Sequence, residues 1–360
     1  MQLRGGSSKG LYFRAADLPD DPAVRKQVLL AAMAGVGPDD RRQIDGLGGA
    51  DPLTSKVAIV SPSQRPGADL DYEFVQVVVG ANTTDGTQNC GNLLAGVVPF
   101  AIEAGLLPAT ANETCARVFL VNSESICEVV VQTPGGRVNY AGSTRIDGAP
   151  GTGAPILCNY LDTAGSACGS LLPTGRLVDA IDGVRVTCLD NGMPVVLLRA
   201  ADLGRTGAEA PEVLNTDTAL KSRLESIRLQ AGPLMNLGDV KAKVVPKMCL
   251  ISPPRHGGII HTRTFIPHVC HAAIGVLGAV SVATACVLPG TVADGVAQLP
   301  AGSQAYSVEH PSGEFTVTLE IDRGGPTPEV RRAGLVRTAR LLSRGEVLIP
   351  EGIWDGKTGR

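Results

Sequence analysis

Apolar and polar positions along the chain predict short strands, one amphipathic helix and two longer apolar helices. Strands are expected where short apolar runs are bounded by glycine, proline or polar residues, at residues 1–4, 11–14, 55–60, 72–79 and 194–198 and as a pair at 118–132 and 137–141. Residues 23–35 are expected to form the amphipathic helix. Residues 93–107 and 274–288 are apolar, too long for ordinary strands and followed by proline, which predicts two buried helices.

Part of this pattern occurs twice. The stretch Arg-Ala-Ala-Asp-Leu at residues 14–18 recurs letter for letter at 199–203, and each copy follows a predicted strand. The ends of the two apolar helices match at nearly the same separation, which indicates a duplicated fold. We therefore predict an α+β protein of two similar domains, residues 1–178 and 179–360, each a curved sheet around one central helix. The helix N-termini would face one cleft, which would be the ligand site.

Composition and charge narrow the class of protein. The 360 residues are 44% hydrophobic and carry a net charge of −3, which argues against disorder and against a nucleic-acid surface. No apolar run reaches membrane-spanning length, the polar N-terminus is no signal peptide, and the nine cysteines form no Cys-x-x-Cys pair. We expect a reduced, cytoplasmic protein with no membrane or nucleic-acid partner.

A polar turn leads directly into the first apolar helix. Asn89, Cys90, Gly91 and Asn92 would lie at its N-terminus, where free N–H groups and the helix dipole favour a bound anion. A cysteine at such a position can be reactive. The alternative is that an asparagine only caps the helix and Cys90 packs as a small apolar residue.

Two basic residues of the first half suggest further chemistry. Lys56 lies at the entrance of an apolar strand, where a lysine desolvated beside other cations can act as a base; an exposed lysine is the alternative. Arg4, with the glycines and hydroxyls that follow it, including Ser7 and Ser8, can bind a carboxylate. A surface turn is the alternative there.

The second half carries a related cluster before its apolar helix. Arg263, His268, Cys270 and His271 precede the position, near Gly275, where a counterpart of the Cys90 turn should fall. No second ligand group has suitable spacing, so we expect no metal. No Rossmann fingerprint, P-loop or G-x-S-x-G motif occurs, and we expect no cofactor.

Four motifs together resemble one family. Residues 4–10, 45–49, 54–58 and 88–92 are similar to those of the PrpF-type isomerases, which have a diaminopimelate epimerase-like fold. The resemblance extends over nearly the whole chain. Residues 190–196, 235–240, 268–282 and 309–315 are most similar to the branch that acts on 4-oxalomesaconate in gallate and lignin-aromatic breakdown.

The resemblance implies cofactor-independent proton transfer within a small unsaturated tricarboxylate, with a keto–enol tautomerase as the expected activity. Lys56 would be the principal base, and Cys90 a second acid or base or a polar neighbour. The implied substrate-binding residues are Arg4, Ser7, Ser8, Asn89, Gly91, Asn92, Arg263, His268 and Gly275. A 1,3-allylic isomerase, a 2-methylaconitate cis–trans isomerase and a non-catalytic polycarboxylate binder stay open as alternatives, as does a homodimeric assembly.

Two departures from the family pattern bear on these expectations. Racemases of this fold use two cysteines, one on each central helix, whereas the second position here falls between Cys270 and Gly275. A cysteine-pair racemase is therefore disfavoured. The chain begins almost at its Arg-Gly-Gly motif, and we expect a shortened or different start.

Overall fold

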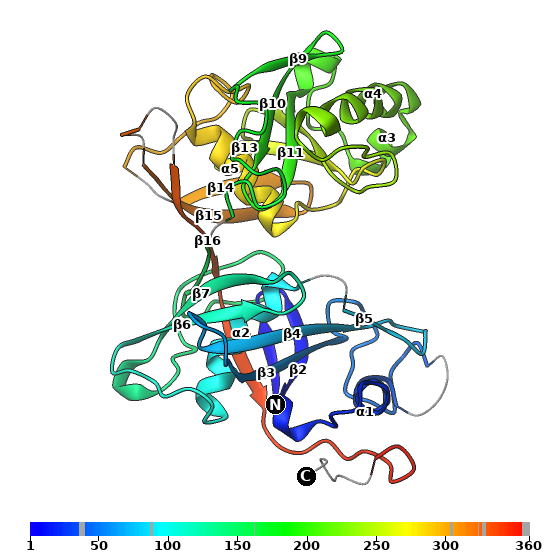
Figure 1. Ribbon diagram of the computed structural model, residues 1–360, viewed down its shortest axis with the longest axis vertical. Coiled ribbons are helices and arrows are strands. Elements are labelled where there is room, and N and C mark those ends of the chain that lie inside the picture. The colour runs from blue at the N-terminus through cyan, green and yellow to red at the C-terminus, as the bar shows by residue number, and fades with distance from the viewer. Residues whose placement is uncertain are drawn as a thin grey trace. The chain divides into compact units, whose positions relative to one another are not determined.

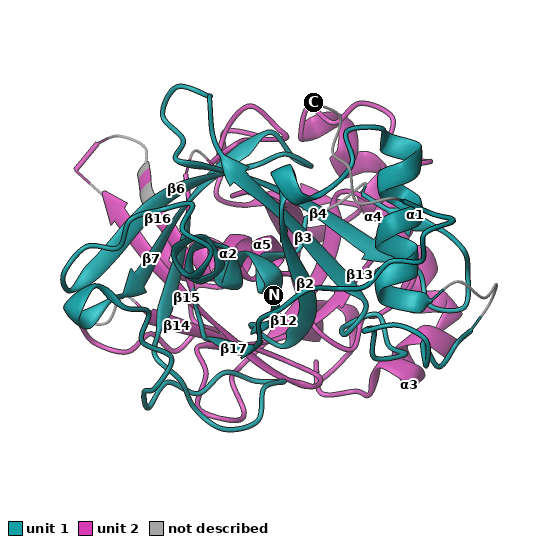
Figure 2. Cartoon of the chain, turned by 90° about the horizontal axis from the view of Figure 1, so that it is seen from below, with its two compact units in different colours: residues 1–159, 336–360 teal, residues 160–335 magenta. Residues whose placement is uncertain are grey.

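The computed structural model describes residues 1–35, 40–86, 89–161, 163–302, 305–322, 324–325 and 329–354. The chain forms two compact units (Figure 2), of which unit 1 comprises residues 1–159 and 336–360 and unit 2 comprises residues 160–335. Each unit combines a sheet with an apolar helix. The prediction of an α+β protein with two similar parts is confirmed.

Unit 1 has an extended, mostly antiparallel sheet. Its strands are β1 (Gln2–Gly5), β2 (Ser8–Arg14), β3 (Lys56–Pro62), β4 (Leu70–Val77), β5 (Thr84–Asp85), β6 (Glu113–Leu120), β7 (Ser125–Gln132), β8 (Ile156–Tyr160) and β17 (Ala339–Ser343). Its helices are η1 (Ala15–Asp17), α1 (Pro22–Ala34), α2 (Gly91–Glu103) and η2 (Pro134–Gly136). Pairing runs β17–β1–β2–β3–β4–β6–β7, and only the β2–β3 and β4–β6 pairs in this series are parallel.

Unit 2 repeats this pairing pattern. Its strands are β9 (Asp179–Ile181), β10 (Val184–Asp190), β11 (Pro194–Arg199), β12 (Lys247–Ser252), β13 (Ile260–Phe265), β14 (Ala305–His310), β15 (Gly313–Asp322) and β16 (Glu329–Arg337). Its helices are η3 (Ala200–Leu203), α3 (Pro211–Thr216), α4 (Thr218–Leu234) and α5 (Val276–Val287). Strands pair in the order β9 to β16, and β11–β12 and β13–β14 are parallel. The repeated sequence motif forms η1 in one unit and η3 in the other.

Each predicted apolar helix lies against the sheet of its own unit (Figure 1). α2 contacts β1, β2, β3, β7 and β17, and α5 contacts β10, β11, β14 and β15. Residues 93–101 of α2 and 278–287 of α5 are buried. Helices that are apolar on every side are stable only when surrounded by other apolar groups. The surrounding strands provide this environment.

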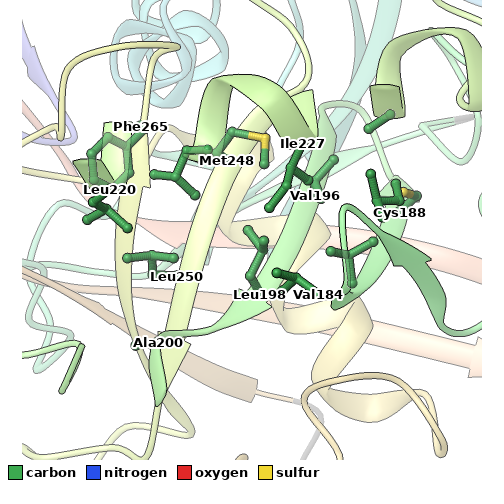
Figure 3. Packing of buried hydrophobic residues seen from close by; sticks show 14 of the residues in the cluster. Val184, Cys188, Val196, Leu198, Ala200, Leu220, Ile227, Met248, Leu250 and Phe265 are labelled. Atoms are coloured by element: carbon green, nitrogen blue, oxygen red, sulfur yellow. The ribbon is translucent and has the colours of Figure 1, made fainter. Parts of the chain in front are cut away.

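The outer faces of the two sheets pack against the remaining helices. In unit 1, residues of β2, β3 and β4 form a core with α1. In unit 2, Val196, Leu198, Met248, Leu250 and Phe265 form a core with Leu220 and Ile227 of α4, as Figure 3 shows. Because side chains alternate along a strand, the residues between these core positions face α2 or α5.

The compact units differ from the predicted domains 1–178 and 179–360. Residues 160–178 belong to unit 2, and residues 336–360 return to unit 1. The return is made by β17, which pairs with β1. Such a pairing joins the two ends of the chain and has no local sequence signature.

The predicted pair of strands at 118–132 and 137–141 is also wrong in detail. Residues 118–132 contain a turn, so that β6 and β7 pair with each other, and residues 137–141 form no strand. The polar residues Asn122 and Ser123 lie in this turn and interrupt the apolar run. The α3 and α4 helices were not predicted, because their apolar positions are sparser than those of α2 and α5.

Candidate functional site

Lys56 opens β3 and lies on the face of the sheet that α2 covers. Val57 and Ile59 point to the α1 core, so Lys56 points to the opposite face by strand alternation. Its ammonium donates a hydrogen bond to Gln76 Oε1 at 2.7 Å and lies 5.0 Å from the centroid of the Phe74 ring. The side chain is half-buried. The lysine is therefore held in place by β4 and is not an exposed surface residue.

Two tyrosines fix the first turn of α2 against this face. The Tyr12 hydroxyl donates to the Leu93 carbonyl at 2.7 Å, and the Tyr72 hydroxyl donates to the Cys90 carbonyl at 3.2 Å. Cys90 is the N-cap residue, and its side chain caps no backbone N–H. The first N–H with a partner in the same helix is that of Leu94, which bonds to the Cys90 carbonyl at 3.1 Å. Among the described residues the preceding N–H groups of α2 have no hydrogen-bond partner, so they can bind an anion.

The loop between β1 and β2 contacts the same helix end. The Ser7 N–H donates to Asn92 Oδ1 at 3.4 Å, and Asn92 Nδ2 donates to Ser7 Oγ at 3.1 Å. Gly6 has φ of +53°, and a Cβ there would lie 2.1 Å from Asn92 Oδ1. Only glycine fits this close approach. Asn92 thus joins the loop to the helix and does not act as an N-cap.

Arg4 of β1 also holds this loop, through hydrogen bonds to Gly6 and to Thr338. Its Nη1 donates to the Gly6 carbonyl at 2.7 Å and to both the carbonyl and Oγ1 of Thr338, at 3.1 and 3.0 Å. Burial lowers the pKa of the guanidinium, and the nearby Arg340 lowers it further. Arg4 therefore fixes the loop that carries Ser7, and its part in substrate binding stays a prediction.

Two buried oxygen atoms near these elements have no hydrogen-bond partner among the described residues. They are Ser8 Oγ and Asn89 Oδ1. Asn89 Nδ2 donates to Ser123 Oγ, which anchors the turn before α2 to the β6–β7 hairpin. Ser8 opens β2 and shares the face of Tyr12 by strand alternation. Leaving a buried polar atom unpaired is costly, so a ligand or a water molecule is expected to bond to each of these oxygens.

In unit 2 the position equivalent to Cys90 is Gly275. Gly275 is the N-cap residue of α5, is exposed, and has open space where a Cβ would lie. Cys270 lies earlier in the chain and is buried, and Asn215 hydrogen-bonds both its N–H and its carbonyl. Burial raises the pKa of the Cys270 thiol to about 11. Cys270 is therefore a buried residue of the segment before α5 and not a thiol at the helix N-terminus.

The structure does not bring Arg263 and His268 to the face of α5. Arg263 shares its face of β13 with Phe265, which belongs to the α4 core. Its guanidinium donates to the Glu209 carbonyl at 2.6 Å and contacts His261 Nε2 at 2.8 Å. His268 is exposed and lies 3.7 Å from Glu225 of α4. Both residues have partners on the α4 side of the sheet, so their predicted part in substrate binding has no support from the structure of unit 2.

A family match extends over almost the entire sequence. The family described as "PrpF protein" matches residues 1–350. This protein belongs to the PrpF family.

Individual PrpF relatives agree with the family match. The chain is 57% identical over 355 residues to the 4-oxalomesaconate tautomerase of Pseudomonas putida, covering 98% of this chain and 96% of that protein. It is 55% identical over 350 residues to the (4E)-oxalomesaconate Delta-isomerase of Novosphingobium sp., covering 97% and 96%. The crystal structure of a methylitaconate-delta-isomerase superposes with a TM-score of 0.86 at 32% identity, covering 98% of this chain and 95% of that one.

A second lysine of this PrpF chain, which the sequence motifs do not single out, opens a strand of unit 2. Lys247 opens β12 as Lys56 opens β3, and it is 9% exposed. Its strand pairs in parallel with β11, as β3 pairs with β2. The internal repeat could have revealed it, because in each half a lysine opens the first strand that follows the Arg-Ala-Ala-Asp-Leu motif.

Neither a metal site nor a membrane-spanning helix is found in the described part of the chain. No three His, Cys, Asp or Glu side chains gather there as a metal site would require. No described helix combines the length and the apolar character needed to cross a membrane.

Unit 2 contains a cavity of about 410 Å³ that lies away from α5's N-terminus. Arg255, Gly258, Ile259, Leu299 and Ser307 are among its lining residues. They lie at the beginning of β13, whereas the segment leading to α5 leaves from the end of that strand. The cavity is therefore not part of the candidate site.

Proposed function

We propose that this protein isomerises 4-oxalomesaconate by proton transfer without a cofactor, acting as a keto–enol tautomerase. The observation that carries the proposal is the placement of Lys56. Its ammonium is held by Gln76 on the α2 face of the unit 1 sheet, the face that also carries Ser8. The substrate class rests on the names of the two relatives that are 57% and 55% identical.

The polar groups around α2 suit a polycarboxylate. Carboxylates accept hydrogen bonds, and the free N–H groups of the first turn of α2, the Ser8 hydroxyl and the Asn92 amide can supply them. Ser7 and Asn92 hold each other in place, so these donors need little reorganisation when substrate binds. Preorganised donors stabilise negative charge that develops in a transition state.

The proton transfer follows from the chemistry of the substrate. Lys56, in its neutral form, would remove an acidic hydrogen next to the carbonyl group and conjugated with the double bond, leaving a dienolate. The N–H groups of α2 would stabilise the negative charge of the dienolate. Return of the proton to oxygen gives the enol, which is the tautomerase outcome. Return to the distant carbon gives the allylic isomer instead.

Cys90 is proposed as an assisting group. It is the N-cap of α2 and half-buried, so it lies beside the same N–H groups. The N-cap residue of α5 in unit 2 is Gly275, which has no thiol. A two-thiol mechanism therefore has no second thiol at that position, and Lys56 is the better candidate for the main base.

The double-bond isomerase is the second candidate function, because the Novosphingobium relative with that name is only two percentage points less identical than the tautomerase (55% against 57%). Both reactions share the dienolate and differ in where it is protonated. The product of the reaction therefore distinguishes the two candidate functions.

The test is an ultraviolet assay of the purified protein with 4-oxalomesaconate and, separately, 2-methylaconitate, followed by proton NMR of each product. We expect turnover of 4-oxalomesaconate with appearance of the enol. An allylic product would favour the double-bond isomerase. Turnover confined to 2-methylaconitate, or absent with both compounds, would refute the proposal.

A further inference from the structure

Gln76 of β4 connects Lys56 to a loop of unit 1 that has no part in the proposed function. Gln76 lies directly opposite Lys56 in the antiparallel β3–β4 pair, so the two side chains lie on the same face of the sheet. Gln76 Oε1 accepts the hydrogen bond from the Lys56 ammonium at 2.7 Å. What holds the other end of this amide therefore decides how firmly the amine of Lys56 is placed.

Three backbone carbonyl groups fix the orientation of the Gln76 amide. Its Nε2 donates to the carbonyl oxygens of Pro52, Ser55 and Val77 at 3.1, 2.9 and 3.1 Å. Turning the amide over would place Oε1 against these oxygens, which can only accept hydrogen bonds. The amide is therefore held with its oxygen toward Lys56.

The segment before β3 supplies two of these carbonyl groups and is itself held by buried contacts. Ser55 is fully buried, and its Oγ donates to Gln43 Oε1 at 2.7 Å. Gln43 Oε1 also accepts from the Ala50 N–H at 2.8 Å. A Cβ at Gly48 would lie 2.1 Å from the same oxygen, so this approach requires glycine. The family motif at residues 45–49 thus folds around Gln43, which fixes Ser55.

A neutral partner suits a lysine that must act as a base. Among the described residues no ion pair joins Lys56 to a carboxylate, and the Phe74 ring centroid lies 5.0 Å from its ammonium. A carboxylate in place of the amide would stabilise the charged form of lysine and oppose its action as a base. The amide oxygen accepts one N–H of the neutral amine as well and leaves the lone pair of the nitrogen free for a substrate hydrogen.

We propose that Gln76 is the positioning residue of the proton transfer, which holds the Lys56 amine in place without giving it a counter-charge. The inference rests on the proposed function for the role of Lys56 as the base. The loop before β3 fixes the amide, and the amide fixes the amine. Because misplacement of a reacting group by about 1 Å can lower a rate about 100-fold, a change at Gln76 should affect proton transfer more than substrate binding.

The test compares Gln76→Met, which keeps the length of the side chain and removes the amide, with Gln76→Glu, which keeps an oxygen acceptor and adds a negative charge. Gln64→Met, at an exposed glutamine between β3 and β4, is the matched control. Kinetics with 4-oxalomesaconate measure kcat and KM as a function of pH. NMR of protein with carbon-13 at lysine Cε, assigned with Lys56→Arg, measures the Hε signals and the titration of Lys56 without substrate.

We expect Gln76→Met to lower kcat by about 10- to 100-fold and to change KM by less than about threefold. The two Hε protons of Lys56 should give separate signals in the wild type, because the amine is held, and one signal in this variant. Gln76→Glu should move both the rising limb of kcat/KM and the NMR titration of Lys56 to higher pH, because the carboxylate stabilises the ammonium. The control should match the wild type.

A purely structural role of Gln76 predicts a lower Tm with unchanged kcat, KM and pH profile in the folded variants. Wild-type kcat with separate Hε signals in Gln76→Met, or an unshifted titration of Lys56 in Gln76→Glu, would overturn the inference. If Gln76→Met does not fold, the titration in Gln76→Glu decides. If the wild type does not turn over 4-oxalomesaconate but the Lys56 signals still depend on Gln76, the proposed function fails and the positioning of Lys56 stands.

Discussion

At the scale of single residues, the candidate catalytic groups are held in place by hydrogen bonds to neighbouring strands. The ammonium of Lys56 donates a hydrogen bond to Gln76 and lies over the ring of Phe74. Cys90 is held through its carbonyl by Tyr72 and leaves its thiol without a capping role. A held amine can meet a substrate hydrogen in a defined geometry, which is a requirement for general acid–base catalysis.

Removing the Lys56 amine should abolish proton abstraction. Lys56→Met keeps the apolar stem, so the protein should fold, but both turnover and exchange of substrate protons into deuterated solvent should fall by at least about 10³-fold, within the usual range for a general base. NMR measures the exchange step separately from later steps. Lys26→Met, on the exposed side of α1, should have no effect. Near-normal exchange in a folded Lys56→Met variant would remove Lys56 from the mechanism.

Replacing the Cys90 thiol should have a milder effect. Cys90→Ser should bind the tricarboxylate and keep measurable turnover, because the N-terminus of α5 carries Gly275 and not a second cysteine. The measurement is kcat/KM beside that of Lys56→Met. A Cys90→Ser variant as inactive as Lys56→Met would restore a thiol-based mechanism.

At the scale of elements, the two central helices are equivalent in place but packed differently. A Cβ at Gly96 of α2 would lie 2.3 Å from the Tyr12 hydroxyl oxygen, whereas a Cβ at Gly278 of α5 would meet its nearest neighbour, a carbon of Ile274, at 3.4 Å. The hydroxyl of Tyr12 is also bonded to the first turn of α2. The close contact at Gly96 therefore sets how α2 lies on the sheet.

A matched pair of substitutions tests this difference. Gly96→Ala should destabilise the protein by about 1–3 kcal/mol, the cost of overpacking a core, and should disturb the hydrogen bond from Tyr12 to Leu93. Gly278→Ala should be neutral or should stabilise by up to about 1 kcal/mol through helix propensity. Urea unfolding measures both. Equal effects of the two substitutions would contradict the packing argument.

At the scale of the whole molecule, the units are not the two halves of the sequence. Unit 1 needs the C-terminal strand β17, which pairs with β1, and Thr338, which binds Arg4. Unit 2 is continuous in sequence. This arrangement makes the loop with Ser7 and Ser8 depend on residues from the far end of the chain.

Fragments should reveal this dependence. A fragment of residues 1–159 should fail to unfold cooperatively, because β1 keeps β2 but lacks its other neighbour, β17. The same fragment joined by a flexible linker to residues 336–354 should regain a cooperative transition in circular dichroism. A fragment of residues 1–159 that folds as well as the linked form would show that β17 is dispensable.

The sequence by itself determined the elements whose physical signal is local. The apolar runs of α2 and α5 were predicted because a helix apolar on every side must be buried, and the actual bounds differ by only a few residues from the prediction. The duplication was visible in a short repeated motif. Lys56 was visible because a charged residue opens an otherwise apolar strand.

Only the tertiary structure decided the features that depend on strand register and on distant pairing. The face of Arg263 follows from which residues of β13 meet α4, and a shift of one position would reverse it. The burial of Lys247 and the return of β17 to β1 depend on contacts between segments far apart in the chain. Local composition does not predict such contacts, because the free energy that stabilises them arises only when the sheet is assembled.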